Sequence, residues 1–157
     1  MNVVKRQRRT IKSIVEIDLK NGYFTYGQIL EAGIAFFDYR TSTRLLDFKV
    51  LVDMPILFVI EVYDHVITKG QFLKVGKLDI RDELDPPPNK FIHDEMNGSF
   101  ELYNPITGEI TSSTKDEVRG LECSSVWESE HVEERIKDYY TGKKNRIVED
   151  FNKVFLD

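Results

Sequence analysis

The chain of 157 residues has few of the features that anchor a protein to a membrane or cross-link it by disulfide bonds. Its single cysteine, Cys123, has no partner for an internal disulfide. The longest apolar run, Ile56–Ile60, stops at Glu61, whereas a membrane-spanning helix needs about 20 apolar residues. The basic residues near the N-terminus are followed by Thr10–Ser13, which lacks the apolar core of a secretory signal. These absences predict a cytoplasmic protein without a membrane partner.

The sequence also lacks the common motifs of enzyme active sites. It contains no GxGxxG, no phosphate-binding GxxxxGK[ST], no GxSxG and no HExxH. His65, His93 and His131 lie far apart, and none has a second histidine or a cysteine at metal-ligand spacing. Cys123 is interpreted as a small buried hydrophobic residue rather than as a nucleophile. We therefore predict no catalytic residue, no metal site and no cofactor, which indicates that the protein is not an enzyme.

The net charge of −5 is distributed unevenly along the chain. Residues 1–10 hold four basic and no acidic side chains, and residues 11–78 hold eight of each. Residues 79–157 hold nineteen acidic and ten basic side chains. Because affinity for nucleic acid rests mainly on neutralising phosphates, this acidic body argues against a nucleic-acid partner and suits a basic protein. The alternative is that the acidic surface only keeps the protein soluble. Residues 1–10 are interpreted as a flexible basic tail.

The first half of the chain has the period-two pattern and the turns of an antiparallel sheet. Val15–Leu19 alternates apolar and polar residues, and Asn21-Gly22 favours a two-residue type I′ turn into a second strand. We expect the sheet to curve where Gly27 and Gly33 interrupt the side-chain pattern. The segments expected as strands or short turns of helix are Val15–Leu19, Tyr23–Leu30, Ile34–Tyr39, Ile56–Tyr63, Phe72–Leu78 at an edge, Asp79–Leu84 as a helical turn, Phe91–His93 and Ser99–Tyr103.

After Ile110 the apolar spacing becomes helical. Thr114–Glu117 is a capping box, which predicts a helix that runs to Trp127. A second helix is expected from about Ser129 to a C-cap at Gly142, and a third from about Asn145. The fold class is therefore α+β: a curved N-terminal antiparallel sheet with C-terminal amphipathic helices packed on it, forming a single domain over residues 11–157.

Two surfaces are candidates for binding. The residues after Trp127 are rich in acid, and at helical spacing three of them share one face, largely opposite the apolar stripe that begins at Val132. This acidic face would dock a basic partner, or it is simply a solvated helix face. The candidate acidic residues are Glu128, Glu130, Glu134 and Asp138. The alternative surface is an aromatic pocket on the sheet that would bind a small molecule or substrate. Its candidate residues are Tyr23, Tyr26, Phe36 and Tyr39. The competing interpretation is that these aromatic side chains only pack in the core.

Short motifs in a fixed order extend over residues 12–150. They are Val15–Ile17, Gly22–Leu30, Ala35–Arg40, Pro86–Pro88 with Phe91, Thr114–Glu117, Gly120–Glu122, Val126-Trp127 and His131–Ile136. Taken together, this ordered set resembles the immunity protein 26 family of bacterial polymorphic toxin systems. The chain departs from the family at Asp94-Glu95, where an Asp-Pro step is expected, and the basic residues 1–10 lie outside the shared region.

The resemblance implies an α+β protein encoded beside a toxin, whose toxic domain it neutralises by binding. It implies a cognate toxin domain as the protein partner, which could be a basic nuclease, and it supplies no catalytic residues. The alternative function is a small-molecule-binding protein or an enzyme that uses the aromatic residues of the sheet. The oligomeric state is left open by the sequence.

Overall fold

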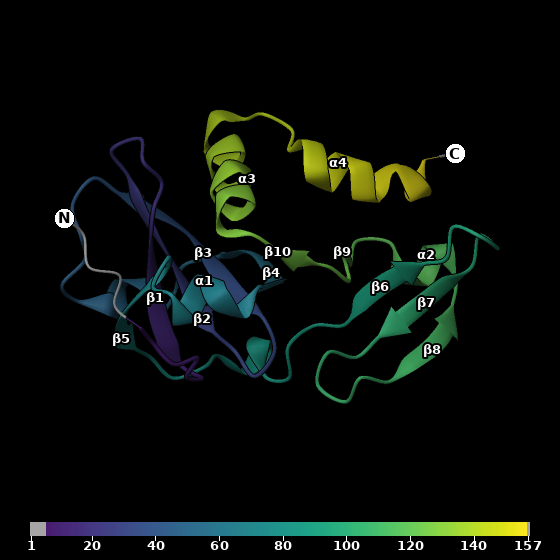
Figure 1. Ribbon diagram of the computed structural model, residues 1–157, viewed down its shortest axis with the longest axis horizontal. Coiled ribbons are helices and arrows are strands. Elements are labelled where there is room, and N and C mark those ends of the chain that lie inside the picture. The colour runs from purple at the N-terminus through teal and green to yellow at the C-terminus, as the bar shows by residue number, and fades with distance from the viewer. Residues whose placement is uncertain (1–5, 157) are drawn as a thin grey trace.

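The computed structural model describes residues 6–156, in which two β-sheets lie side by side along the long axis of the molecule (Figure 1). The chain first builds most of the larger sheet and then the smaller one. It finally returns to the larger sheet through a short strand and a helix. Strands therefore lead the chain and the longest helix follows them, so the fold is α+β as the sequence predicts.

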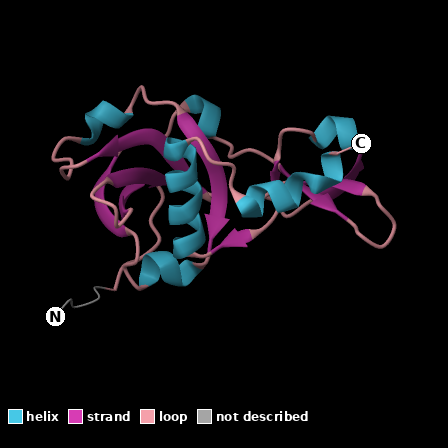
Figure 2. Ribbon diagram, turned by 90° about the horizontal axis from the view of Figure 1, so that it is seen from above, coloured by secondary structure: helices cyan, strands magenta, loops and turns pink. Residues whose placement is uncertain are grey.

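The larger sheet, called here the large sheet, has six strands within the described residues, in the order β10-β4-β3-β2-β1-β5. They are β1 (Ser13–Asp18), β2 (Phe24–Ile29), β3 (Ile34–Thr41), β4 (Ile56–Val62), β5 (Leu73–Lys77) and β10 (Val126–Trp127). The neighbours are antiparallel except that β10 pairs with β4 in parallel. The sheet is curved (Figure 2), and the register shifts beside Gly27, where an added Cβ would lie 2.9 Å from Cγ2 of Ile34.

The connection between β1 and β2 is a hairpin, but its turn type differs from the expected one. The positive φ angles fall at Lys20 (60°) and Gly22 (91°), and not at both Asn21 and Gly22. The backbone N–H of Leu19 donates to the carbonyl of Tyr23 at 3.0 Å, which closes a loop longer than two residues. The carboxylate of Asp18 and the amide of Asn21 accept from backbone N–H groups within this loop. These local side-chain bonds stabilise the longer turn.

The helix α3 (Ser129–Thr141) packs across the large sheet (Figure 2). Val132 and Ile136 are fully buried in the main core cluster, and Gly142, with φ of 72°, ends the helix in the left-handed region. This helix and its cap are as the sequence predicts. The helix α4 (Arg146–Asn152) follows, and its N-cap Asn145 accepts from two backbone N–H groups of the first turn.

The small sheet has the order β8-β7-β6-β9 within the described residues. Its strands are β6 (Lys90–His93), β7 (Phe100–Tyr103), β8 (Ile110–Ser113) and β9 (Glu122–Cys123). The shorter helical elements of the chain are α1 (Asp64–Thr68), α2 (Lys115–Val118), η1 (Phe48–Leu51), η2 (Asp82–Leu84) and η3 (Lys153–Phe155). Within residues 6–156, no helix has the length and apolar character that crossing a membrane requires.

The predicted helix from Thr114 to Trp127 is wrong beyond its first turn. Thr114 does cap α2, accepting from the backbone N–H of Glu117 at 3.2 Å. The chain leaves the helical region at Arg119, with ψ of 130°, and Gly120 has φ of 91°. The following residues then pair as β9 with β6 and as β10 with β4. Partners distant in the sequence thus satisfy backbone groups that a helix would have bonded locally.

Part of the expected basic tail is anchored to the large sheet. The side chain of Gln7 donates to the carbonyls of Ile67 and Phe72, both at 2.8 Å, and accepts from the backbone N–H of Lys74. Arg9 donates to the carbonyl of Gly33 at 3.1 Å. Residues 6–10 are therefore bonded to the protein body instead of extending freely, and residues 1–5 lie outside the described residues.

The burial of α3 leads to a first prediction. Ile136→Ala removes a fully buried side chain from the interface between α3 and the large sheet, so we expect the free energy of unfolding to fall by about 2–5 kcal/mol. Urea denaturation followed by circular dichroism measures this change. Glu130→Ala, at an exposed position of the same helix, is the matched control and should change stability by less than about 0.5 kcal/mol. Equal stability of the two variants would contradict the packing described here.

Candidate functional site

The acidic residues of α3 do not form the free charged face that the sequence predicts. Only Glu130 is exposed. The carboxylate of Glu134 lies 3.2 Å from Nε of Arg146, and the carboxylate of Asp138 accepts from Nδ2 of Asn145 at 3.0 Å. Both contacts arise because the chain turns back after Gly142 and brings the start of α4 against the end of α3. The expectation of three solvent-exposed carboxylates is thus correct for one residue and wrong for two.

Glu128 lies at the N-cap position of α3 and connects it to α1. Its Oε2 lies 2.9 Å from Nε2 of His65, and the imidazole ring stacks on the ring of Tyr63 with 5.5 Å between centroids. Both side chains are about one-third exposed, so this pair is accessible from solvent. The contact joins the start of α3 to α1 at the surface of the protein.

The four aromatic residues proposed as a pocket do not share a face of the sheet. Phe36 belongs to the core cluster beneath α3, and Tyr23 packs against that same cluster. Tyr26 belongs to the cluster on the other side, and Tyr39 packs there. Tyr26 is fully buried, and burial together with its hydrogen bond to Glu16 raises its pKa to about 12. These four rings pack on two sides of the sheet, so the structure does not bring them together in one pocket.

A cluster that the sequence does not indicate joins the end of α3 to β3. The hydroxyls of Tyr139 and Tyr140 donate to the two carboxylate oxygens of Asp38 at 2.7 and 2.9 Å. The guanidinium of Arg40 lies between two rings, 4.2 Å from the centroid of Tyr23 and 4.7 Å from that of Tyr140. Burial and then the bond to Asp38 raise the pKa of Tyr140, so the hydroxyl stays protonated. About one hundred residues separate these partners in sequence, which is why no local pattern reveals them.

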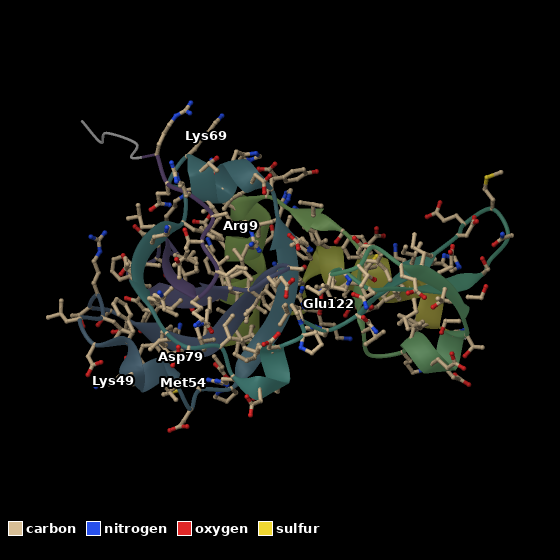
Figure 3. The ribbon with its side chains drawn as sticks, turned by 90° about the horizontal axis from the view of Figure 1, so that it is seen from below. Arg9, Lys49, Met54, Lys69, Asp79 and Glu122 are labelled. Atoms are coloured by element: carbon tan, nitrogen blue, oxygen red, sulfur yellow. The ribbon has the colours of Figure 1, made fainter. Side chains whose placement is uncertain are left out.

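Charged side chains also meet at the junction of the two sheets. Arg135 of α3 donates two hydrogen bonds to the carboxylate of Glu122 in β9, both at 2.8 Å (Figure 3 places Glu122 between the sheets). Its guanidinium lies 3.8 Å from the centroid of Phe58 and 5.2 Å from that of Trp127. Lys90 of β6 is buried and donates from Nζ to the carbonyl of Val59, and burial lowers its pKa. This cluster binds the sheets together.

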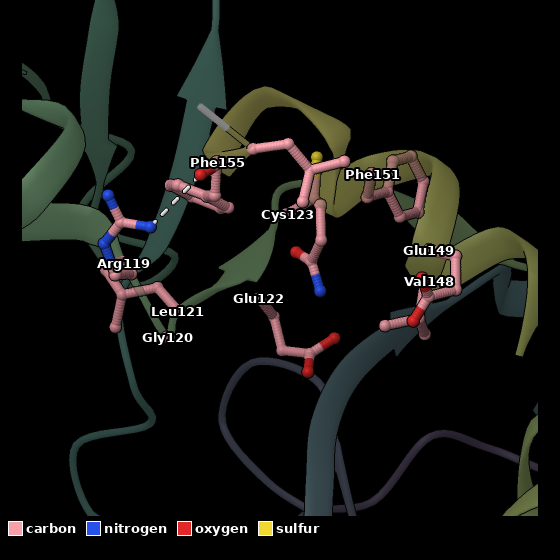
Figure 4. Close-up of a pocket in the computed structure, with 11 residues that line it drawn as sticks. Arg119, Gly120, Leu121, Glu122, Cys123, Val148, Glu149, Phe151 and Phe155 are labelled. Carbon is pink, nitrogen blue, oxygen red and sulfur yellow. Dashed lines mark hydrogen bonds between the residues drawn. The ribbon is translucent and has the colours of Figure 1, made fainter. Parts of the chain in front are cut away.

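An open cleft of about 400 Å³ lies between β9 and the end of the chain (Figure 4). Its walls include Cys123, Phe151 and Phe155, and Arg119 donates to the carbonyl of Phe155 at 3.3 Å. Burial raises the pKa of the Cys123 thiol to about 11, so the thiol is protonated at neutral pH and is a weak nucleophile. The cleft can accept an apolar side chain but offers no group prepared for catalysis.

The remaining chemistry-bearing residues are dispersed. Within residues 6–156, no three histidine, cysteine or acidic side chains lie close enough to hold a metal ion. His93 lies against the ring of Phe100 with 4.8 Å between centroids, on the small sheet, while His65 lies on α1. The three histidines are therefore not brought together by the fold.

Comparison with known protein families gives a match. The model of the family described as Immunity protein 26 matches residues 13–102, which span β1 to β6 and all of β7 except Tyr103. No curated protein and no solved structure matches the chain significantly. The matched segment covers the large sheet apart from β10, together with the first hairpin of the small sheet.

The junction cluster leads to a second prediction. Arg135→Lys keeps the positive charge but loses the paired hydrogen bonds to Glu122 and the flat stacking on Phe58, so we expect a loss of stability of about 1–3 kcal/mol. Thermal and urea unfolding measure the loss. Arg146→Lys is the matched control, because Arg146 makes a largely exposed contact with Glu134 and should change stability by less than about 0.5 kcal/mol. The same small effect for both variants would show that the junction does not depend on the guanidinium.

Proposed function

Because this chain belongs to the immunity protein 26 family, we propose that it neutralises a cognate polymorphic toxin by binding the toxic domain in the producing cell. The family match over residues 13–102, more than half of the chain, is the observation that carries the proposal. The role is one of binding and not of catalysis. The protein would cover the surface by which the toxic domain reaches its target, which requires shape and charge complementarity instead of a reactive group.

The charge of the chain supports a partner with a basic surface. A net charge of −5 slows association with acidic surfaces and speeds association with basic ones, as in the substrate clefts of nucleases. Of the acidic residues first considered on α3, Glu128 and Glu130 remain accessible, while Glu134 and Asp138 hold α4. The proposal therefore includes a basic toxic domain, with a nuclease as the favoured case.

The third prediction tests neutralisation directly. Cells that produce the toxic domain encoded beside this gene should stop growing, and co-production of the wild-type chain should restore growth by forming a stable complex. Gel filtration of the purified pair measures the complex. Association should slow as salt rises from about 50 to 300 mM, because screening weakens attraction between exposed charges. Cell death in the presence of abundant folded chain would refute the proposed function.

The fourth prediction concerns the histidines. Because the proposed role needs no proton transfer, His65→Asn, His93→Asn and His131→Asn should each leave protection intact. His65→Asn should reduce stability slightly, because the imidazole contact with Glu128 at 2.9 Å is lost. Growth rescue and thermal unfolding measure the two effects separately. A variant that folds and binds the toxic domain but no longer protects would reveal a catalytic role for that histidine.

A further inference from the structure

The small sheet has one covered face. Antiparallel partners directly opposite each other lie on the same face, so Phe91 shares a face with Leu102, and His93 shares it with Phe100. Phe155 of η3 packs on this face, with 5.0 Å between its ring centroid and that of Phe91. The guanidinium of Arg119, which follows α2, lies 5.5 Å from the ring centroid of Phe155. The chain's C-terminal segment and the end of α2 thus cover this side.

The opposite face of the small sheet is open over β7 and β8. The register places Tyr103 between Lys90 and Ile110 in one row and Glu101 between Ile92 and Ser112 in the next. Lys90 is buried and donates to the carbonyl of Val59 in the large sheet, so it is not part of the accessible surface. Ile110 is 51% exposed, and the side chains of Tyr103, Ile92, Glu101 and Ser112 are exposed or partly exposed. Among the described residues, no hydrogen bond, ion pair or ring contact joins these five side chains to another element. We call these five residues the open face: Ile92, Glu101, Tyr103, Ile110 and Ser112.

The net charge of the molecule is concentrated in the part that carries the open face. Residues 85–125 contain eight acidic and three basic side chains, a net charge of −5. Residues 6–84 together with 126–156 contain eighteen of each, so they are neutral. The acidic half of the sequence is therefore not acidic throughout. Its excess charge lies on the small sheet and its loops, while residues 129–156, which include α3 and α4, hold six acidic and six basic side chains.

The acidic side chains nearest the open face are not neutralised internally. Glu101 lies on the face, whereas Glu109 precedes Ile110 and lines a shallow depression with Leu102 and Thr111 of the other face. Neither makes an ion pair among the described residues. Apolar side chains beside unpaired charge are typical of protein–protein interfaces, in which the apolar part is desolvated and the charged part stays wet. A tyrosine in the apolar part supplies contact area at small cost in side-chain entropy.

We propose that the open face of the small sheet is the surface that binds the toxic domain, and that the toxic domain presents a basic surface to it. This inference rests on the proposed function and replaces α3 as the main docking element. Charge complementarity selects the partner, because residues 85–125 would repel an acidic protein and attract a basic one. Tyr103 and Ile110 would form the desolvated part of the contact, and the carboxylate of Glu101 beside them would steer the approach.

Matched charge reversals test the location of the surface. Glu101→Lys places the change on the open face, and Glu130→Lys places the same change at an exposed position of α3. Association rates with the purified toxic domain encoded beside the gene are measured at about 50 mM salt. We expect Glu101→Lys to slow association by about tenfold and Glu130→Lys by less than about twofold. Circular dichroism confirms that each variant is folded.

Matched apolar truncations test the centre of the surface. Ile110→Ala should raise the dissociation constant by about tenfold, mainly through faster dissociation, whereas Leu46→Ala, at a highly exposed position of the large sheet region, should leave it unchanged. Because both residues are exposed, neither change should prevent folding.

The outcomes separate the inference from the function on which it rests. If the wild-type chain binds and protects, and the small-sheet variants behave as wild type, the open face is not the toxin surface and the inference is wrong. If Glu130→Lys alone impairs binding, the surface is on α3. If the wild-type chain neither binds nor protects, the proposed function fails and the inference fails with it.

Discussion

The guanidinium of Arg135 is the interaction on which the arrangement of the two sheets depends. It stacks on Phe58 of β4 and lies near Trp127 of β10, and its two donors bind Glu122 of β9. One side chain thus contacts both sheets from the helix that covers the larger one. A planar, delocalised cation can do this because its faces pack on aromatic rings while its edge makes paired hydrogen bonds. A lysine has no equivalent geometry.

This junction explains why the chain returns to the large sheet after building the small one. β10 pairs in parallel with β4, and the backbone N–H of Tyr63 donates to the carbonyl of Trp127 at 3.1 Å. That pairing sets the start of α3, whose buried residues then cover the large sheet. The same return places β9 against β6 and leaves the β8 edge of the small sheet farthest from the large one. The small sheet is consequently covered on one face and open on the other.

The distribution of charge follows from this arrangement and bears on the function. The carboxylates of Glu134 and Asp138 are used within the protein, because α4 folds back on the end of α3. On the small sheet, Glu122 is bound by Arg135, but Glu101 and Glu109 make no ion pair among the described residues. A molecule whose large sheet and helices are electrically balanced, and whose small sheet carries the net charge, presents one strongly negative end. An immunity protein of this form would meet a basic toxic domain with that end.

The periodicity of the sequence determined much of the architecture by itself. Strands β1 to β5 of the large sheet, the helix from Ser129 with its cap at Gly142, and the helix that starts after Asn145 follow from local patterns of apolar residues and capping groups. These features depend on neighbours in sequence, so their signals are local. The match of residues 13–102 to the immunity protein 26 family likewise agrees with motifs that are visible in the sequence.

Only the tertiary structure decided the rest, because the partners lie far apart along the chain. The segment from Glu122 to Trp127 has helical spacing but becomes two short strands, since β4 and β6 offer it backbone partners. The carboxylate of Asp38 accepts from two tyrosines about a hundred residues later, and no local pattern records such a contact. The faces of Tyr26 and Phe36 were likewise settled by the register shifts within the sheet. The spacing of residues in the sequence predicts which of them can share a face. Only the tertiary packing determines which face remains open and which charges remain unpaired.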